Sequence, residues 1–310
     1  FNRSSIAVNL MWFASETGNS FYFDESYFTD TGKNRRRQYF DAPALVWLSS
    51  FEPQYNEPPP PVWKGEGINP LVIFRGENKN PDMYYFGAKG GKASNNHGNM
   101  DAGSFIFELD GVRWSIDLGN QNYNTLEQAG FDLWNSNQNS ERWSLLTKSN
   151  FGHSVLTVNN ELHTTGGFAS VTEFRKGING GNPEAIFDMT EVFAEKLQKA
   201  ERKFIKDSPR SLIIQDYIIL DGSTEMLTWQ MVTKAEVEIV EGGAVLKQRG
   251  KTLKLENLSH PELTVSVVSL FPAPLELDVQ VEELKRLEIN LPAWIFEDGK
   301  GEIKVRLTGE

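Results

Sequence analysis

The sequence predicts a mainly β protein, in which a large antiparallel β-sandwich follows a short helical segment and precedes a smaller β-sheet unit. Short apolar or alternating runs, separated by Gly, Asn and Asp, recur from about residue 61 to the end of the chain. Such runs are typical of strands in sandwiches built from antiparallel sheets. A run of prolines at residues 58–61 precedes them. Because proline cannot continue a helix or lie inside a sheet, we expect a domain boundary there.

The segment of residues 1–60 is predicted to be helical. Large apolar residues cluster among small ones, without strict alternation, at residues 4–15 and again at residues 40–51, which indicates two helices. Between them, the sequence GKNRRR at residues 32–37 is expected to form a basic, exposed turn.

Residues 61–233 are predicted to form the sandwich. Asp110-Gly111 is a favourable type I′ turn pair and predicts an antiparallel hairpin between the runs that flank it. Asn159-Asn160 is expected to form a second turn. The strands expected here lie at residues 70–75, 83–88, 104–109, 113–118 and 153–163.

Residues 188–204 are ambiguous, because their Ala, Glu, Lys and Leu content favours a helix whereas both neighbouring stretches resemble strands. A short helix or a long loop is expected there. From residue 211 onward, short strands alternate with turns, and the part from residue 234 is predicted to be a smaller β unit. The three expected domains are therefore residues 1–60, 61–233 and 234–310.

Composition argues against several classes of function. Acidic residues outnumber basic ones, 42 to 31, and the net charge is −11, which argues against nucleic-acid binding because phosphate recognition needs a basic surface. An acidic polymer would therefore need a locally basic cleft. No apolar run reaches the length of about 18 residues that a membrane span needs. Because cysteine is absent, any metal must bind His, Asp, Glu or Asn.

Two residues are candidates for chemistry from their local context. His97 lies in a Gly- and Asn-rich loop, GGKASNNHGNMDAG, which lets backbone and side chains approach a ligand closely. The alternative for His97 is a solvent-exposed turn histidine. Asp117 ends an otherwise buried run and must be hydrogen-bonded, paired or metal-bound. The alternative for Asp117 is a carboxylate that only accepts backbone N–H groups at the strand end.

A metal site and a further proton carrier are also expected. His153 opens another strand and would meet Asp117 if the two strands are neighbours. One Asp with one or two His or Asn side chains suits zinc or a similar cation. Tyr123 follows the strand end closely and is a candidate proton donor or acceptor, although most tyrosines of sheet proteins pack in the core or on the surface. His163 and His260 are expected to be structural.

The block of residues 84–123, YYFGAKGGKASNNHGNMDAGSFIFELDGVRWSIDLGNQNY, resembles the core motif of heparinase II/III-like polysaccharide lyases. That motif is HxHxDAGSF, followed by a hairpin and a D-x-G strand end. Two further stretches agree in the same order: SNFGHSVLTVNNELH resembles the family's G-H-(N/S)-x-L-x-V segment, and LTWQMVTKAEVEI resembles its W-Q-x-H-T-x-A-x-V strand. The resemblance covers about residues 71–239.

The resemblance implies an N-terminal α/α toroid joined to a β-sandwich, with the active site in the cleft between them. The helices before residue 58 would then be the end of the toroid. The implied reaction is β-elimination on a uronic-acid polysaccharide such as a glycosaminoglycan or alginate. The resemblance also implies a bacterial periplasmic or secreted location. The implied partners are the acidic polysaccharide and the toroid of the same enzyme, and a homo-oligomer is left open.

Carried over residue by residue, the resemblance makes His97 the active-site histidine of the sandwich domain and Asn96 a carboxylate contact. Asp117 and His153 match positions that hold a zinc ion in heparinase II-like enzymes. Asn99 stands where the motif has its second histidine. Because a neutral amide oxygen is a weaker zinc ligand, either the metal is weaker or different, or the site is structural.

Three functions are left open at this stage. The first is a lyase, or the sandwich half of one, with His97 and Tyr123 as its catalytic residues. The second is a non-catalytic carbohydrate-binding or structural sandwich, which Asn99 favours. In the family, the catalytic tyrosine and its partner histidine come from the toroid. Because a toroid is not expected in this chain, their expected absence also favours the second function. The third is a metal-dependent hydrolase on the same scaffold.

Overall fold

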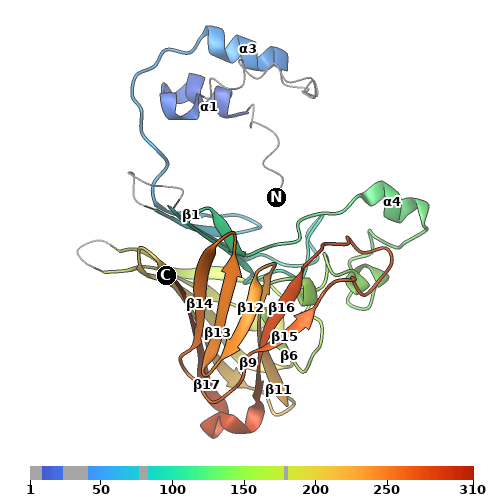
Figure 1. The fold of residues 1–310 in the computed structure, drawn as a ribbon. Helices are drawn as coiled ribbons and strands as arrows, with labels where there is room; N and C mark the ends of the chain where they lie inside the picture. Colours follow the sequence, from blue (N-terminus) through green and yellow to red (C-terminus); the bar gives the residue numbers. More distant parts are fainter. Residues whose placement is uncertain (1–8, 24–40, 77–82, 178–180) are drawn as a thin grey trace. The chain divides into compact units, whose positions relative to one another are not determined.

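The computed structural model describes residues 9–23, 41–76, 83–177 and 181–310 (Figure 1). The chain forms two compact units, Phe1–Pro60 and Pro61–Glu310, and the division falls within the proline run. The turn predicted at residues 32–37 lies outside the described residues. None of the helices in the described ranges is long and apolar enough to cross a membrane.

The first unit is helical. Met11 and Ala44 are fully buried in its small apolar cluster, one from each α-helix. Asn19 bonds to both backbone groups of Glu57, at 2.8 and 3.0 Å. Within the described residues, helices are thus present in both predicted stretches. They are α1 (Asn9–Thr17), a 3-10 helix η1 (Ser20–Tyr22) and α3 (Asp41–Ser49).

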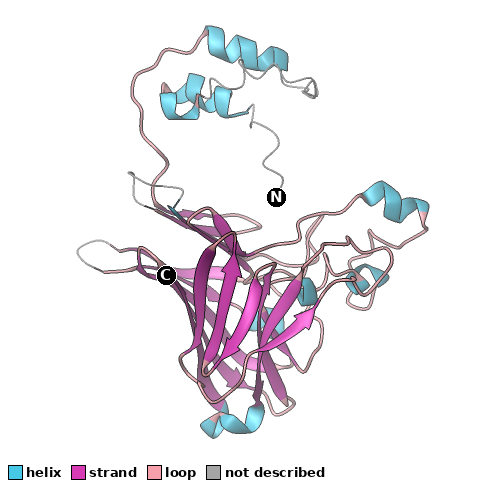
Figure 2. Ribbon diagram, in the orientation of Figure 1, coloured by secondary structure: helices cyan, strands magenta, loops and turns pink. Residues whose placement is uncertain are grey.

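The second unit consists of antiparallel sheets (Figure 2). The five-stranded sheet contains, in order, β1 (Val62–Gly65), β2 (Leu71–Arg75), β3 (Tyr84–Lys89), β4 (Phe105–Leu109) and β5 (Val112–Ser115). The four-stranded sheet contains β15 (Ser266–Ser269), β16 (Lys285–Pro292), β11 (Met226–Thr233) and β6 (Leu156–Val158).

The eight-stranded sheet is the largest. Its order is β12 (Glu236–Val240), β13 (Gly243–Gln248), β14 (Lys251–Asn257), β17 (Lys300–Gly309), β10 (Ser211–Leu220), β9 (Leu197–Ser208), β8 (Pro183–Asp188) and β7 (Ser170–Lys176). Every strand pairing described in the second unit is antiparallel. The predicted fold class, a mainly antiparallel β protein, is confirmed.

Aromatic side chains join the sheets in one core. Phe86 of β3 and Phe105 of β4 contact Phe204 of β9, with ring centroids 4.8 and 5.8 Å apart. Trp229 of β11, in the four-stranded sheet, is fully buried in the same cluster. Complete burial of a side chain such as Phe stabilises a fold by roughly 1.5–3 kcal/mol. The three sheets therefore depend on each other for their stability.

The β4–β5 hairpin is present as predicted. Asp110 and Gly111 have φ values of 54° and 76°, and a type I′ turn requires positive φ at both central residues. β5 ends at Ser115, so Asp117 follows the strand in a loop instead of closing it. The loops that leave this hairpin carry the candidate site residues.

Residues 188–204 contain both a helical turn and a strand. The 3-10 helix η6 (Thr190–Phe193) is the short helix that was expected, but β9 begins at Leu197. β9 pairs with β8 on one side and β10 on the other. Its ladder bonds and buried side chains outweigh a helix preference worth less than about 1 kcal/mol per residue.

The boundary predicted between residues 233 and 234 is not a domain boundary. β14 pairs with β17, β17 pairs with β10, and β16 pairs with β11. Leu253, Leu255 and Ile303 belong to the same core as the earlier strands. Because the late strands complete the sheets and core of residues 61–233, Pro61–Glu310 forms one compact unit.

Candidate active site

The loop between β3 and β4, residues 90–104, carries His97 and several other candidate side chains. Gly91 exchanges two backbone hydrogen bonds of 2.9 Å with Ala169, which fixes the start of the loop. Gly91 and Gly103 have φ values of 94° and 75°, which glycine adopts at little cost. His97 has a φ of 59°. Positive φ is uncommon at non-glycine residues, and such strained positions concentrate at functional sites.

An aromatic cluster surrounds His97. The rings of His97 and Tyr123 are stacked, with centroids 5.6 Å apart, and His97 Nδ1 lies 3.3 Å from the Tyr123 hydroxyl. Trp134 packs edge-on against both rings, at 5.3 and 5.2 Å, and is 50% exposed. Tyr123 begins α4 (Tyr123–Gln128), whose first turn is capped by Asn122. Since His97 is exposed, two proton-carrying groups meet where a large substrate can reach them.

A buried lysine contacts the same cluster. Lys148 is 1% exposed, and its ammonium lies 5.3 Å from the centroid of the Tyr123 ring. The ammonium donates hydrogen bonds to Oδ1 of Asn99 at 3.1 Å and to Oδ1 of Asn120 at 3.3 Å. Burial, together with repulsion from Arg142, lowers the pKa of Lys148 to about 8. Lys148 is therefore still mostly a cation at neutral pH.

Asp117 and His153 are in contact. His153 Nδ1 lies 2.9 Å from Asp117 Oδ2, and the Gly119 N–H donates to Asp117 Oδ1 at 2.7 Å. Burial opposes the charge on Asp117, but His153 and Gly119 outweigh it and lower the pKa of Asp117 to about 2. Burial also opposes protonation of His153, yet Asp117 outweighs it and raises the pKa of His153. Asp117 is thus both paired and bonded to backbone.

Asp101 completes a group whose chemistry fits a divalent cation. One ligand atom from each of Asp101, Asp117 and His153 lies within 4.8 Å of the others. His153 Nε2 is buried and has no hydrogen-bond partner in the described part of the chain, which is uncommon for a buried polar atom. Two carboxylates and one imidazole suit zinc or a similar metal. The Lys89 ammonium, 2.6 Å from Asp101 Oδ1, already supplies part of the positive charge there.

Asn99 and Asn96 have other surroundings. The Oδ1 atom of Asn99, the predicted metal-ligand atom, accepts a hydrogen bond from the Lys148 ammonium at 3.1 Å. Asn96 is exposed beside His97, and its side chain forms no hydrogen bond with the residues that the structure describes. A bound ligand could therefore reach Asn96.

A family model described as "Heparinase II/III-like, C-terminal" matches residues 82–305. The chain belongs to this family. No curated protein matches the sequence. Among solved structures, the heparan sulfate lyase HepC from Pedobacter heparinus has 14% sequence identity and a TM-score of 0.58, and the match covers 86% of this chain and 39% of that protein. A heparinase III has 11% identity and a TM-score of 0.55, with 84% and 38% covered. At these identities the likeness shows the fold, and this chain spans less than half the length of those proteins.

Sequence reasoning missed three residues of this heparinase II/III-like chain. Asp101 stands in the quoted DAGSF motif, so the motif itself could have suggested it. Trp134 and Lys148 lie in stretches without a motif, LWNSN and LTKSN. Nothing local distinguishes a buried lysine from a solvated one, because the distinction depends on contacts with distant loops.

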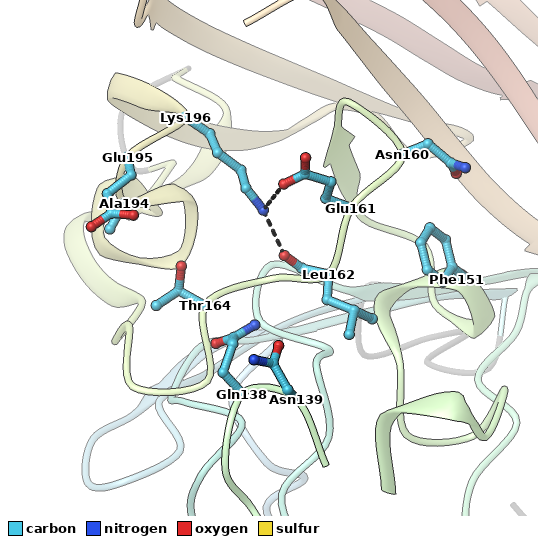
Figure 3. A pocket seen from close by; sticks show the side chains of 10 residues that line it. All are labelled: Gln138, Asn139, Phe151, Asn160, Glu161, Leu162, Thr164, Ala194, Glu195 and Lys196. Carbon is cyan, nitrogen blue, oxygen red and sulfur yellow. Dashed lines mark hydrogen bonds and ion pairs between the residues drawn. The ribbon is translucent and has the colours of Figure 1, made fainter. Parts of the chain in front are cut away.

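A concave region of this heparinase II/III-like unit lies around Lys196, away from the residues described above, and is shown in Figure 3. The cavity has a volume of about 530 Å³ and is lined by residues that include Gln138, Phe151, Glu161 and Thr164. The Lys196 ammonium points toward Glu161 Oε2, at 2.8 Å, and the Leu162 carbonyl oxygen, at 2.9 Å. Its lining contains neither a histidine nor a tyrosine, so we place the candidate active site at His97.

Proposed function

We propose that this chain is the β-sheet part of a polysaccharide lyase that cleaves a uronic-acid-containing acidic polysaccharide by β-elimination. The observation that carries the proposal is the 3.3 Å contact between His97 Nδ1 and the Tyr123 hydroxyl on an exposed surface. β-Elimination removes the C5 proton of the uronate and expels the 4-linked sugar, and it consumes no water. Both events need proton carriers beside the sugar ring.

His97 and Tyr123 are proposed as these carriers. An imidazole and a phenol can each accept or donate a proton, and a direct contact lets a proton pass from one to the other. Asn96, exposed beside His97, is proposed to contact the uronate carboxylate. Neutralising this carboxylate makes the C5 proton acidic enough to remove, because it stabilises the charge that develops in the transition state.

The proposed cofactor is a divalent metal ion, with zinc as the expected ion. Asp101, Asp117 and His153 would hold it, since their ligand atoms converge and one His153 nitrogen has no partner in the described part of the chain. A bound cation would supply positive charge between the loop after β5, which carries Asp117, and the loop before β4, which carries Asp101. The reaction steps proposed above belong to His97 and Tyr123.

A non-catalytic carbohydrate-binding sandwich is the second candidate. The exposed face of Trp134, beside His97 and Tyr123, favours it, because sugars pack readily on exposed aromatic rings. Both candidates place an acidic polysaccharide at the same surface. Only the lyase requires turnover, and a hydrolase would give products heavier than the lyase's by one water.

The test is an incubation of the full-length protein with heparan sulfate, other glycosaminoglycans and alginate, followed at the ultraviolet absorbance of unsaturated uronate. Absorbance on at least one polymer, lost in His97→Ala and kept in His260→Ala, is expected. No absorbance on any polymer would refute the lyase. The proposed partners and location, a helical toroid domain of the same enzyme and the bacterial periplasm or exterior, are tested by the full-length sequence and by cell fractionation.

A further inference from the structure

Two cations near His97 are bonded to neutral oxygens. The Lys148 ammonium donates to the amide oxygens of Asn99 and Asn120. Arg142, which is 3% exposed, donates to the backbone carbonyl oxygen of Gly98 at 2.6 Å. Neither cation takes part in an ion pair within the described ranges. Asp101 and Asp117 act on Lys148 from a longer range. In a chain of net charge −11, the two cations thus contribute positive charge beside the proposed active site without a direct carboxylate partner among the described residues.

The ammonium also fixes the orientation of the two amides. Lys148 can only donate hydrogen bonds, so the oxygens of Asn99 and Asn120 must face it and their NH₂ groups must face away. Neither NH₂ group forms a hydrogen bond with a residue that the structure describes. A cation bonded to an amide oxygen polarises the amide and strengthens its N–H donors. The arrangement therefore presents oriented donors without an acceptor.

These donors lie close to the proposed proton carriers. Asn99 follows His97 by two residues, and Asn120 precedes Tyr123 by three. Lys148 links the two amides to the proposed proton carriers, since its ammonium contacts both amides and lies 5.3 Å from the centroid of the Tyr123 ring. Asn120 is exposed and Asn99 is half-buried, so a ligand can reach them, whereas Lys148 itself is covered.

We propose that Asn99 and Asn120 form an anion subsite that binds the uronate carboxylate of the substrate together with Asn96, with Lys148 as the positioning residue that orients both amides. The subsite rests on the proposed function and names the part of the site that recognises the acidic group. It also supplies exposed N–H donors for the acidic groups of a polymer on a chain of this charge. Arg142 is bonded to the Gly98 carbonyl oxygen in the loop that carries His97, so it adds to the positive potential there.

The test compares charge-matched asparagine variants of the full-length protein. Asn120→Asp keeps an oxygen toward Lys148 but replaces the outward donors with an acceptor, whereas Asn124→Asp makes the same charge change at an exposed residue of α4. The probes are hyaluronan, alginate and heparan sulfate tetrasaccharides and their carboxyl-reduced counterparts, with Kd measured by titration calorimetry. Hyaluronan and alginate carry carboxylates without sulfate, which separates the two kinds of anion.

At least one native tetrasaccharide is expected to bind about tenfold more weakly to Asn120→Asp than to the wild type, since hydrogen bonds to charged groups are worth about this much. Asn124→Asp should bind it as the wild type does, and the carboxyl-reduced probe should bind all three proteins weakly and alike. Lys148→Met should weaken native binding similarly, and Lys148→Arg should restore most of it. If Lys148→Met does not fold, the comparison of Asn120→Asp with Asn124→Asp alone tests the subsite.

Three results would overturn the subsite. They are equal effects of Asn120→Asp and Asn124→Asp, wild-type binding that survives carboxyl reduction, and no binding of any tetrasaccharide by the wild type. Failure of the lyase is distinguishable, because it gives carboxylate-dependent binding without unsaturated product. Failure of the subsite alone gives unsaturated product with a KM that Asn120→Asp does not change.

Discussion

His153 Nδ1 lies 2.9 Å from Asp117 Oδ2, although 36 residues separate them in the chain. The backbone oxygen of His153 also accepts a hydrogen bond of 2.9 Å from Gln230 of β11. The backbone of His153 is thus bonded to the four-stranded sheet, while its imidazole contacts the loop after β5. Asp101 reaches the same place from the loop before β4, so three separate segments converge on one small polar group.

Zinc is expected to stabilise the protein through this group. At a free zinc concentration of about 100 times Kd, binding contributes about 2.7 kcal/mol, which raises Tm by roughly 5 °C or more in a unit of this size. His153→Ala should abolish the rise, whereas Asn99→Ala should keep it because Asn99 is bonded to Lys148. Scanning calorimetry and metal analysis of the purified proteins provide the measurements. A zinc-induced rise of equal size in His153→Ala would exclude this metal site.

Tyr123→Phe is expected to reduce lyase turnover by roughly 10²- to 10⁴-fold, the range for loss of a general acid or base. The phenyl ring keeps its stacking on His97 and Trp134, so the free energy of unfolding should change little. Product absorbance gives the rate, and urea unfolding gives the stability. Tyr85→Phe, on β3, is the matched control and should retain full turnover. Full turnover in Tyr123→Phe would remove the hydroxyl from the mechanism.

The parts of the fold that the sequence predicted are those that depend on neighbouring residues. Asp110-Gly111 could be assigned because a two-residue turn is determined by its own φ values. β9 could not, because its strand pairing comes from β8 and β10, which outweighs a local helix preference. The late strands were assigned to a separate unit for the same reason, since their partners lie earlier in the chain.

In the candidate site, too, the sequence predicted what depends on local patterns and missed what depends on distant contacts. The sequence suggested Asp117 and His153 from burial and motif, and the structure brings them together. Lys148 was not suggested, because its role depends on Asn99, which precedes it by 49 residues, and on Asn120. A sequence pattern identifies residue types that suit a reaction, but it does not show which distant loops supply the charge beside them.

Arg202→Met is expected to destabilise the second unit by about 3–5 kcal/mol, the cost of leaving one partner of a buried ion pair alone. Arg202 of β9 bonds to Asp216 of β10 at 2.6 and 2.9 Å, and both side chains are at most 3% exposed. Arg202 also donates to the Gly103 carbonyl oxygen at 3.0 Å, which holds the end of the His97 loop.

The double variant Arg202→Met/Asp216→Leu should recover part of that loss, because it leaves no buried charge unpaired. Lys247→Met breaks an exposed cross-strand pair with Glu238 in the same sheet and should leave the urea midpoint almost unchanged. Chemical unfolding of the four proteins measures these differences. A double variant no more stable than Arg202→Met would show that the unpaired charge of Asp216 does not determine the cost.

His163 is expected to make the protein less stable in mild acid. His163 Nε2 lies 2.8 Å from the Leu156 carbonyl oxygen, and Nδ1 is buried with no hydrogen-bond partner in the described part of the chain. Burial lowers the pKa of His163 to about 3. The unfolded chain therefore binds the proton at a higher pH than the folded chain does. The stability is fully present above the unfolded pKa of about 6.5 and is lost as the pH falls from there toward 3.

Between pH 7 and pH 5 this loss is about 2 kcal/mol from His163 alone. His163→Gln can keep a donor to Leu156 without titrating, so the variant should lose about 2 kcal/mol less than the wild type over the same interval. Urea unfolding of both proteins at the two pH values isolates the histidine, because every other titrating group is common to them. Equal losses of unfolding free energy in the two proteins would mean that His163 is protonated in the folded chain. The prediction that buried His163 stays neutral would then be wrong.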